Sequence, residues 1–232
     1  MRKLNPGYKC IGIFLPALIL SFRFQIILNI YVFGVSLILL ILSQPSFKRM
    51  FKLFVPVIVT AAGLFMTGFF FSSNTAVIHN AGMGYPPSVA NGLQLATRIL
   101  AYAGLGMLFS FTTNMKDFIY SLEQQFRLPS RFAYGVLSAF HLGPMMPYEY
   151  KKTSHAFLAR GQKFFPFLPR VLVPFIIKSV RWSESLAIAM ESKGFDQDGP
   201  RTCLQVMRVR WYDYAFVVMF VGLTVLGIFL LQ

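Results

Sequence analysis

Charged side chains are scarce in this chain of 232 residues, in which 13% of the residues are Asp, Glu, Lys or Arg and 56% are hydrophobic. A water-soluble domain carries about 25% charged residues. The shortage, together with a mean hydropathy of +0.59, excludes an ordinary soluble domain, a disordered chain, a collagen and a coiled coil. Much of the protein surface must therefore face lipid.

Negative charge is scarcer still, because 8 acidic residues stand against 22 Lys and Arg and leave a net charge of +14. Such an excess favours an anionic neighbour, either lipid headgroups or an acidic protein partner. Nucleic acid is not an expected partner, since basic and acidic residues are interleaved and no nucleic-acid motif accompanies them. Two cysteines, Cys10 and Cys203, are too few for a disulfide framework or a Cys-rich metal site.

The sequence also lacks a catalytic constellation. Its three histidines do not occur at the i, i+4 spacing that places two metal ligands on one helix face; they are His79, His141 and His155. No glycine-rich phosphate loop followed by Lys and Ser or Thr occurs, so the chain is not expected to hydrolyse ATP by that route. Glu149, Glu184 and Glu191 lie among Lys and Arg and are interpreted as solvated ion-pairing residues. We expect no metal, no cofactor and no enzymatic activity.

Long stretches without charge predict where the chain crosses a membrane. Residues 53–97 contain no Asp, Glu, Lys or Arg, and a spanning helix needs about 20 apolar residues. Four spans are predicted at residues 24–42, 53–71, 93–111 and 214–231. A shorter apolar segment, residues 11–22, is interpreted as a fifth crossing, either the first arm of a hairpin or a tilted, protein-buried helix. Arg98 lies inside the third long span and should snorkel or face protein.

The distribution of Lys and Arg predicts the orientation, because short loops rich in these residues stay in the cytoplasm. Three basic residues lie within positions 2–9 and three within positions 48–52, so both segments are expected inside. The turn-rich segment 72–92 is then expected outside, as is Gln232. The basic start resembles a signal peptide, but no small-residue cleavage site follows, so no removal is expected.

A polar insertion precedes the last span. Fourteen of the 22 basic residues and seven of the eight acidic ones lie between Lys116 and Arg210. Helix start and stop signals predict helices over residues 114–127, 129–141, 147–161 and 175–193, with three prolines breaking residues 166–174. We therefore predict an all-α polytopic membrane protein of about five transmembrane helices. Its predicted domains are 1–112 (membrane helices), 113–211 (cytoplasmic coupling helices) and 212–232 (last span).

Two of the predicted cytoplasmic helices end in the same way. One ends Ala159-Arg160-Gly161 and the other ends Ser192-Lys193-Gly194, so that each delivers one cation. A cation in the last turn of a helix and a glycine just beyond it are common. The cation complements the helix dipole, and the glycine adopts the left-handed conformation of the cap. Two such helix ends in one membrane protein nevertheless suggest two docking contacts for a soluble partner.

These motifs resemble a known family. The Ala-Arg-Gly end, followed further along the chain by the segment 181–195 with its Glu-Ser-Lys-Gly-Phe ending, is similar to the T component of energy-coupling factor (ECF) transporters, the EcfT and CbiQ-like family. Further similarity lies in the Pro-x-x-Lys stretch of residues 5–9, in residues 112–129, and in Arg201-Thr202 with Asp213.

The resemblance implies a function and partners. The two helices would be coupling helices that dock on a pair of ABC-type ATPases, and a separate membrane S component would capture a vitamin, a vitamin precursor or a transition-metal ion. The implied ATPase-docking residues are Ala159, Arg160, Gly161, Ser192, Lys193 and Gly194. Lys193 departs from the family arginine, because lysine keeps the charge but lacks the planar fork. The implied location is the cell membrane, crossed several times.

An apolar stretch beside the second coupling helix suggests the surface that holds the capture subunit. The candidate contacts are Phe167, Leu168, Val171 and Leu172; the competing interpretation is internal packing between the two docking helices. For the whole protein, the alternative hypothesis is a membrane-embedded enzyme or a stand-alone carrier. It would depend on the few polar residues within the spans: Arg98, Gln94 and Asn29.

Overall fold

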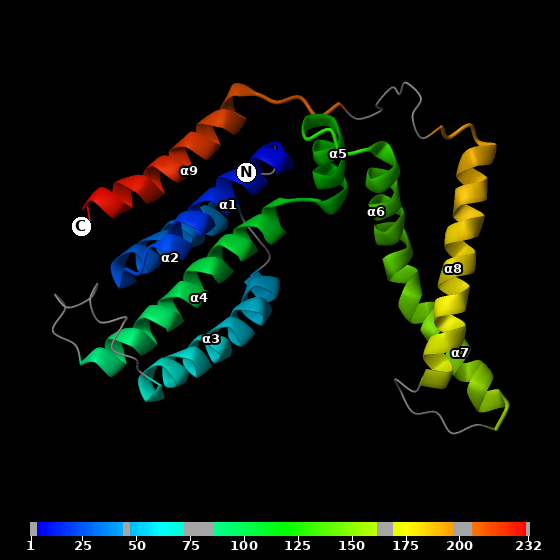
Figure 1. The fold of residues 1–232 in the computed structure, drawn as a ribbon, viewed down its shortest axis with the longest axis horizontal. Coiled ribbons are helices and arrows are strands. Elements are labelled where there is room, and N and C mark those ends of the chain that lie inside the picture. Colours follow the sequence, from blue (N-terminus) through cyan, green and yellow to red (C-terminus); the bar gives the residue numbers. More distant parts are fainter. Residues whose placement is uncertain (1–3, 44–46, 72–85, 162–168, 197–205, 231–232) are drawn as a thin grey trace. The chain divides into compact units, whose positions relative to one another are not determined.

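A computed structural model describes residues 4–43, 47–71, 86–161, 169–196 and 206–230 of the chain. The described residues form helices and contain no strand, which confirms the predicted all-α class. The chain divides into two compact units (Figure 1). Unit 1 comprises Met1–Ser121 and Met207–Gln232, and unit 2 comprises Leu122–Val206.

Unit 1 contains the apolar helices. They are α1 (Pro6–Phe22), α2 (Ile26–Leu42), α3 (Phe47–Phe70), α4 (Pro87–Thr112) and α9 (Trp211–Leu230), and α5 (Met115–Gln125) begins in this unit. Among the described residues, α3, α4 and α9 are long and apolar enough to cross a membrane, whereas α1 and α2 are shorter apolar helices. The predicted spans all fall largely within these helices. The chain is a multi-pass protein of the cell membrane.

The boundaries of two predicted segments were wrong. α1 begins at Pro6, ahead of the predicted segment, because Asn5 caps the helix and proline is favoured in its first turn. α4 begins at Pro87, so residues 87–92 are helical although they were expected in an external loop. Proline again starts the helix, since its fixed φ suits the first helical position. Most of the remaining expected loop lies outside the described residues.

α4 packs against α2 and α3, and α1 packs against α9 and α4. The contact of α3 with α4 requires two glycines. A Cβ on Gly68 would lie 2.7 Å from the Cα of Gly92, and a Cβ on Gly92 would lie 2.7 Å from the Phe65 carbonyl oxygen. Small residues allow this close approach, which is typical of helix pairs in lipid, where packing rather than the hydrophobic effect holds helices together.

Arg98 of α4 faces protein, one of the two outcomes expected for it. Its Nη2 donates to the carbonyl oxygens of Leu20 and Ser21 at the end of α1, and its guanidinium lies 4.6 Å from the centre of the Phe24 ring. A cation at a helix C-terminus satisfies unpaired carbonyls and the helix dipole. Arg98 therefore caps a helix inside the apolar unit.

Unit 2 contains the remainder of α5, followed by α6 (Ser130–Leu142), a short 3₁₀ turn (Gly143–Met145), α7 (Met146–Ala159) and α8 (Pro169–Ser192). The predicted helices over 129–141 and 147–161 match α6 and α7. The prediction of a proline-broken segment up to residue 174 was wrong, because α8 begins at Pro169 and continues through Pro174. Pro169 occupies the first helical position, so only Pro174 removes a backbone hydrogen bond.

Candidate functional site

The first docking motif is the capped end of α7. Arg160 is the C-cap residue, and its backbone N–H donates to the Phe157 carbonyl oxygen at 3.1 Å. The Gly161 N–H donates to the Leu158 carbonyl oxygen at 2.9 Å. Gly161 has φ +73°, a left-handed conformation that glycine adopts without the clash of a Cβ. The predicted glycine cap is confirmed here.

The second motif ends α8 in a Schellman arrangement. The Gly194 N–H donates to the Glu191 carbonyl oxygen at 2.9 Å, and the Phe195 N–H donates to the Met190 carbonyl oxygen at 3.0 Å. Gly194 has φ +80°. This pair of bonds around a left-handed glycine stops the helix and satisfies its last carbonyls. The sequence predicted the glycine cap of this helix correctly as well.

Both caps present their cations to solvent. Arg160 and Lys193 are exposed, as are Ala159, Gly161, Ser192 and Gly194. Within the described part of the chain, neither the Arg160 nor the Lys193 side chain forms an ion pair or a hydrogen bond. The charges of Arg160 and Lys193 are therefore available to a group outside this chain.

The two cations lie at opposite ends of unit 2, because α8 runs antiparallel to the helices that it contacts. The ring of Phe195, beyond the C-terminus of α8, lies 5.6 Å from that of Tyr134 near the start of α6, whereas Lys178 in mid-helix pairs with Glu149 at the start of α7. At 1.5 Å per residue, Lys193 is roughly 22 Å beyond Lys178 and Arg160 roughly 16 Å beyond Glu149, in opposite directions. Figure 1 shows the same divergence of the two helix ends.

An ion pair holds α7 against α8 where they cross. The Lys178 Nζ donates to Glu149 Oε2, and the ring of Tyr150 lies 6.4 Å from that of Phe175 in an edge-on arrangement. Glu149 is 7% exposed, so the prediction of a solvated residue was wrong for it, although the ion-pairing role is right. The crossing with α8 covers this carboxylate, and the sequence did not reveal that crossing. Glu184 and Glu191 are exposed as expected.

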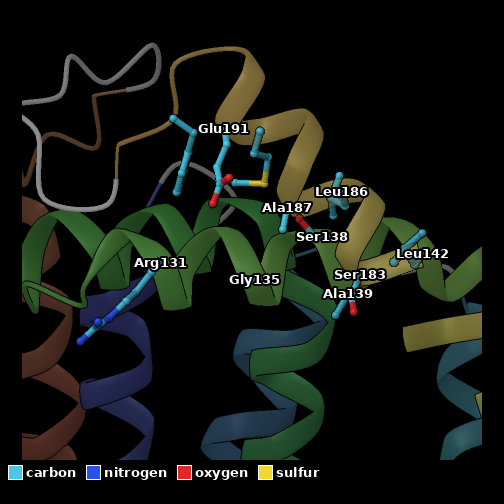
Figure 2. A pocket seen from close by; sticks show the side chains of 11 residues that line it. Arg131, Gly135, Ser138, Ala139, Leu142, Ser183, Leu186, Ala187 and Glu191 are labelled. Atoms are coloured by element: carbon cyan, nitrogen blue, oxygen red, sulfur yellow. The ribbon is translucent and has the colours of Figure 1, made fainter. Parts of the chain in front are cut away.

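A cavity of about 330 Å³ separates α6 from the C-terminal half of α8. Figure 2 shows Arg131, Gly135 and Ala139 on the α6 side of this cavity, and Ser183 and Glu191 on the α8 side. Its wall also includes Met190 and Phe195, the residues whose backbones close the Schellman cap. The cavity was not predicted, since it depends on how two helices that are far apart in the sequence pack together.

The structure describes only part of the suspected capture-subunit surface. Phe167 and Leu168 lie outside the described residues, and Val171 lies in α8. Leu172 is 38% exposed, and it belongs to a row of exposed apolar residues on α8. That row is Leu172, Val173, Ile176, Ile177 and Val180. Such exposure disfavours the alternative in which Leu172 packs between the docking helices.

The three residues of the alternative hypothesis all lie within the helix packing of unit 1. Arg98 caps α1. Asn29 is fully buried, and its Nδ2 donates to Thr97 Oγ1 at 3.3 Å. Gln94 is 3% exposed, and neither polar atom of its side chain has a partner among the described residues. Cys10 is a free thiol in α1, and Cys203 and His79 lie outside the described residues.

Comparisons with known proteins found a family model and relatives that match the chain. The family model described as CbiQ, cobalt transport protein, matches residues 1–204. A protein of Macrococcus caseolyticus (strain JCSC5402), described as energy-coupling factor transporter transmembrane protein EcfT, is 24% identical over 250 residues, which cover 99% of this chain and 93% of that relative. A protein of Streptococcus equi subsp. equi (strain 4047) with the same description is 24% identical over 254 residues, covering 99% and 91%.

Proposed function

The chain belongs to the CbiQ family of cobalt transport proteins, and from this premise we propose that it is the transmembrane energy-coupling subunit of an ECF-type ABC importer. In this role it links a pair of cytoplasmic ATPases to a separate membrane subunit that captures the substrate. The work of ATP hydrolysis passes through unit 2, and the chain itself catalyses no reaction. The transported compound is a vitamin, a vitamin precursor or a transition-metal ion, and its choice belongs to the capture subunit.

One observation carries the ATPase pairing: the two exposed, glycine-capped cations at opposite ends of unit 2. A partner with two equivalent subunits can receive one helix end in each subunit. The distance between the ends of α7 and α8 leaves room for both subunits. A carboxylate in each ATPase groove would complement the cations. Arg160 can make a bidentate contact to such a group, whereas Lys193 offers a compact ammonium with three donors.

The experiment that tests this function starts from the complete complex in native membranes. We expect a tagged chain to co-purify with two ABC-type ATPase subunits and a small, very hydrophobic membrane protein. After reconstitution, ATP should drive uptake of one member of a panel of Co²⁺, Ni²⁺ and B vitamins. A chain that purifies without ATPases and transports a panel member alone would instead be a stand-alone carrier.

The exposed apolar row of α8 supports the proposed contact with the capture subunit. The proposed contacts with the capture subunit are Phe167, Leu168, Val171 and Leu172. Tilting of α8 would then tilt the capture subunit. Leu172→Glu should release the capture subunit while the ATPases stay bound, because a carboxylate without a partner in an apolar interface costs several kcal/mol.

Ile188→Glu is the matched control for Leu172→Glu. Ile188 is also an exposed aliphatic residue of α8, but it lies roughly 160° around the helix from Leu172 at 3.6 residues per turn. The capture subunit should stay bound in this variant. If Leu172→Glu releases the ATPases together with the capture subunit, the residue packs within unit 2; if both partners stay and uptake is normal, this surface faces lipid.

A further inference from the structure

A cluster of buried polar side chains lies in unit 1 where the chain leaves for unit 2 and returns from it. The cluster, here called the polar clasp, comprises Asn5, Lys9, Ser121 and Asp213, and these residues are 5%, 2%, 0% and 2% exposed. Ser121 is the last residue of unit 1 before unit 2, and Asp213 follows the return at Met207. Two connections that are far apart in sequence therefore meet at one buried site.

Asn5 bonds to both connections. Its side-chain Oδ1 accepts a hydrogen bond from the Ser121 Oγ at 2.7 Å, on the outgoing side. Its backbone N–H donates to the Asp213 Oδ1 at 2.8 Å, on the returning side. The Ser121 Oγ also accepts from the Gly7 N–H at 3.0 Å. The segment that begins α1 thus ties the outgoing and returning chains together.

The charged members of the clasp cap helices. The Asp213 Oδ2 accepts from the Arg210 N–H at 2.8 Å at the start of α9, where a carboxylate complements the helix dipole. The Lys9 Nζ donates to the Thr112 carbonyl oxygen at 3.0 Å at the end of α4, where a cation does the same. The ends of α1, α4 and α9 are therefore bound to the same cluster.

The bonds of the clasp differ from that of Ser36, another fully buried hydroxyl in unit 1. Ser36 is as buried as Ser121, yet its Oγ donates to the Phe33 carbonyl oxygen in its own helix. The Ser121 and Asp213 bonds to Asn5 join segments 116 and 208 positions apart. A bond within one helix leaves the position of that helix free, whereas bonds between distant segments fix their relative positions.

We propose that Asn5, Ser121 and Asp213 are positioning residues for energy coupling. They hold both connections to unit 2 against the ends of α1, α4 and α9, so that a displacement of unit 2 moves these helices together instead of bending two loose connections. The inference rests on the proposed function. It adds to that function the residues that transmit a displacement of unit 2 to the membrane helices. The clasp is expected to stay closed throughout the transport cycle.

The first experiment compares Ser121→Ala with Ser36→Ala in the complete reconstituted complex. Both changes delete one buried hydroxyl in unit 1, but only Ser121 belongs to the clasp. The measured quantity is the amount of substrate taken up per ATP hydrolysed, with the panel member that the wild-type complex transports as the probe. Loss of one buried hydrogen bond changes a population about fivefold. Ser121→Ala loses the bond to Asn5 Oδ1 and the bond from the Gly7 N–H, so we expect this ratio to fall at least about fivefold.

Three further results are expected from the same comparison. The Ser121→Ala complex keeps its ATPases and its rate of ATP hydrolysis, Ser36→Ala retains the wild-type ratio, and Ser121→Thr, which keeps the hydroxyl, restores much of it. An unchanged ratio in Ser121→Ala, or an equal fall in Ser36→Ala, would overturn the proposal. A wild-type complex without ATPases would instead overturn the proposed function, so the two failures are distinguishable.

A disulfide provides a test that does not depend on the alanine variant folding. Asn5→Cys combined with Ser121→Cys, in a Cys10→Ser and Cys203→Ser background, replaces the hydrogen bond between these side chains by a bond that oxidation closes and reduction opens. The oxidised complex should transport with the wild-type ratio, and the reduced complex should show the lower ratio of Ser121→Ala. Loss of transport in the oxidised complex, or a ratio that reduction leaves unchanged, would contradict a clasp that must remain closed.

Discussion

The polar side chains of the two units are used in opposite ways. In unit 1, the side chains of Lys9 and Asp213 are almost completely buried and bind backbone groups of distant segments. In unit 2, Arg160 and Lys193 extend into solvent from glycine-capped helix ends. An unpaired polar group costs more within a membrane unit, where no water replaces a missing partner. The comparison indicates that unit 1 uses polarity to fix its own helices, whereas unit 2 keeps its charges for partners.

Removal of the two exposed cations of unit 2 should have the largest effect. Arg160→Ala with Lys193→Ala should abolish ATPase co-purification, because truncating one side of a desolvated charge pair costs about 2–5 kcal/mol. Lys152→Ala with Arg181→Ala is the matched control, since these cations are also exposed on α7 and α8 but lie away from the helix ends. Equal ATPase binding in both double variants would show that the docking residues were assigned wrongly.

The buried ion pair of unit 2 is the exception to the comparison and gives the next largest effect. Glu149→Ala should lower the free energy of unfolding of the purified complex by about 1.5 kcal/mol, the lower end for a charged hydrogen bond, because the Lys178 side chain is 38% exposed. Glu184→Ala, which removes an exposed carboxylate from α8, should change it by less than about 0.5 kcal/mol. Thermal unfolding in detergent measures both. Equal effects would mean that the crossing of α7 and α8 does not depend on this pair.

In both units the sequence predicted local features and missed contacts between distant segments. Apolar length predicted the helices of unit 1, and the capping signals predicted the ends of α7 and α8, because both depend on neighbouring residues. The clasp was not predictable, since Asn5 and Asp213 meet only after the helices between them have packed. One local signal was present: Asn5 before Pro6 is typical of a helix start. The burial of Glu149 was missed for the same reason as the clasp, because it requires α8, a separate helix further along the chain.

Backbone conformation at the α8 cap gives an effect of similar size, and its sign depends on the conformation of the glycine that is replaced. Gly194→Ala should destabilise by about 1–2 kcal/mol, because a Cβ in the left-handed region clashes with the following carbonyl oxygen. A Cβ there meets no other atom within 4 Å, so the whole effect comes from the backbone. Gly135→Ala in α6, where a Cβ likewise meets nothing, should stabilise by about 0.5–1 kcal/mol. Thermal unfolding should show stability changes of opposite sign for the two variants. A loss of stability in both, or a gain in both, would show that Gly194 does not act as a helix stop.

The smallest predicted effect concerns Arg127, which follows α5 just inside unit 2. Its φ is +52°, and beside it the Leu128 N–H donates to the Leu122 carbonyl oxygen at 3.3 Å. The left-handed conformation destabilises a non-glycine residue by about 1–2 kcal/mol, and glycine would remove this strain. Glycine would in turn destabilise the folded protein by about 0.5–1 kcal/mol, because it gives the unfolded chain more freedom. Arg127→Gly should therefore stabilise the protein by about 0.5 kcal/mol, whereas Lys152→Gly, in the middle of α7, should destabilise it by about 1 kcal/mol. A loss of stability in Arg127→Gly would mean that the arginine side chain, rather than the turn, holds this segment.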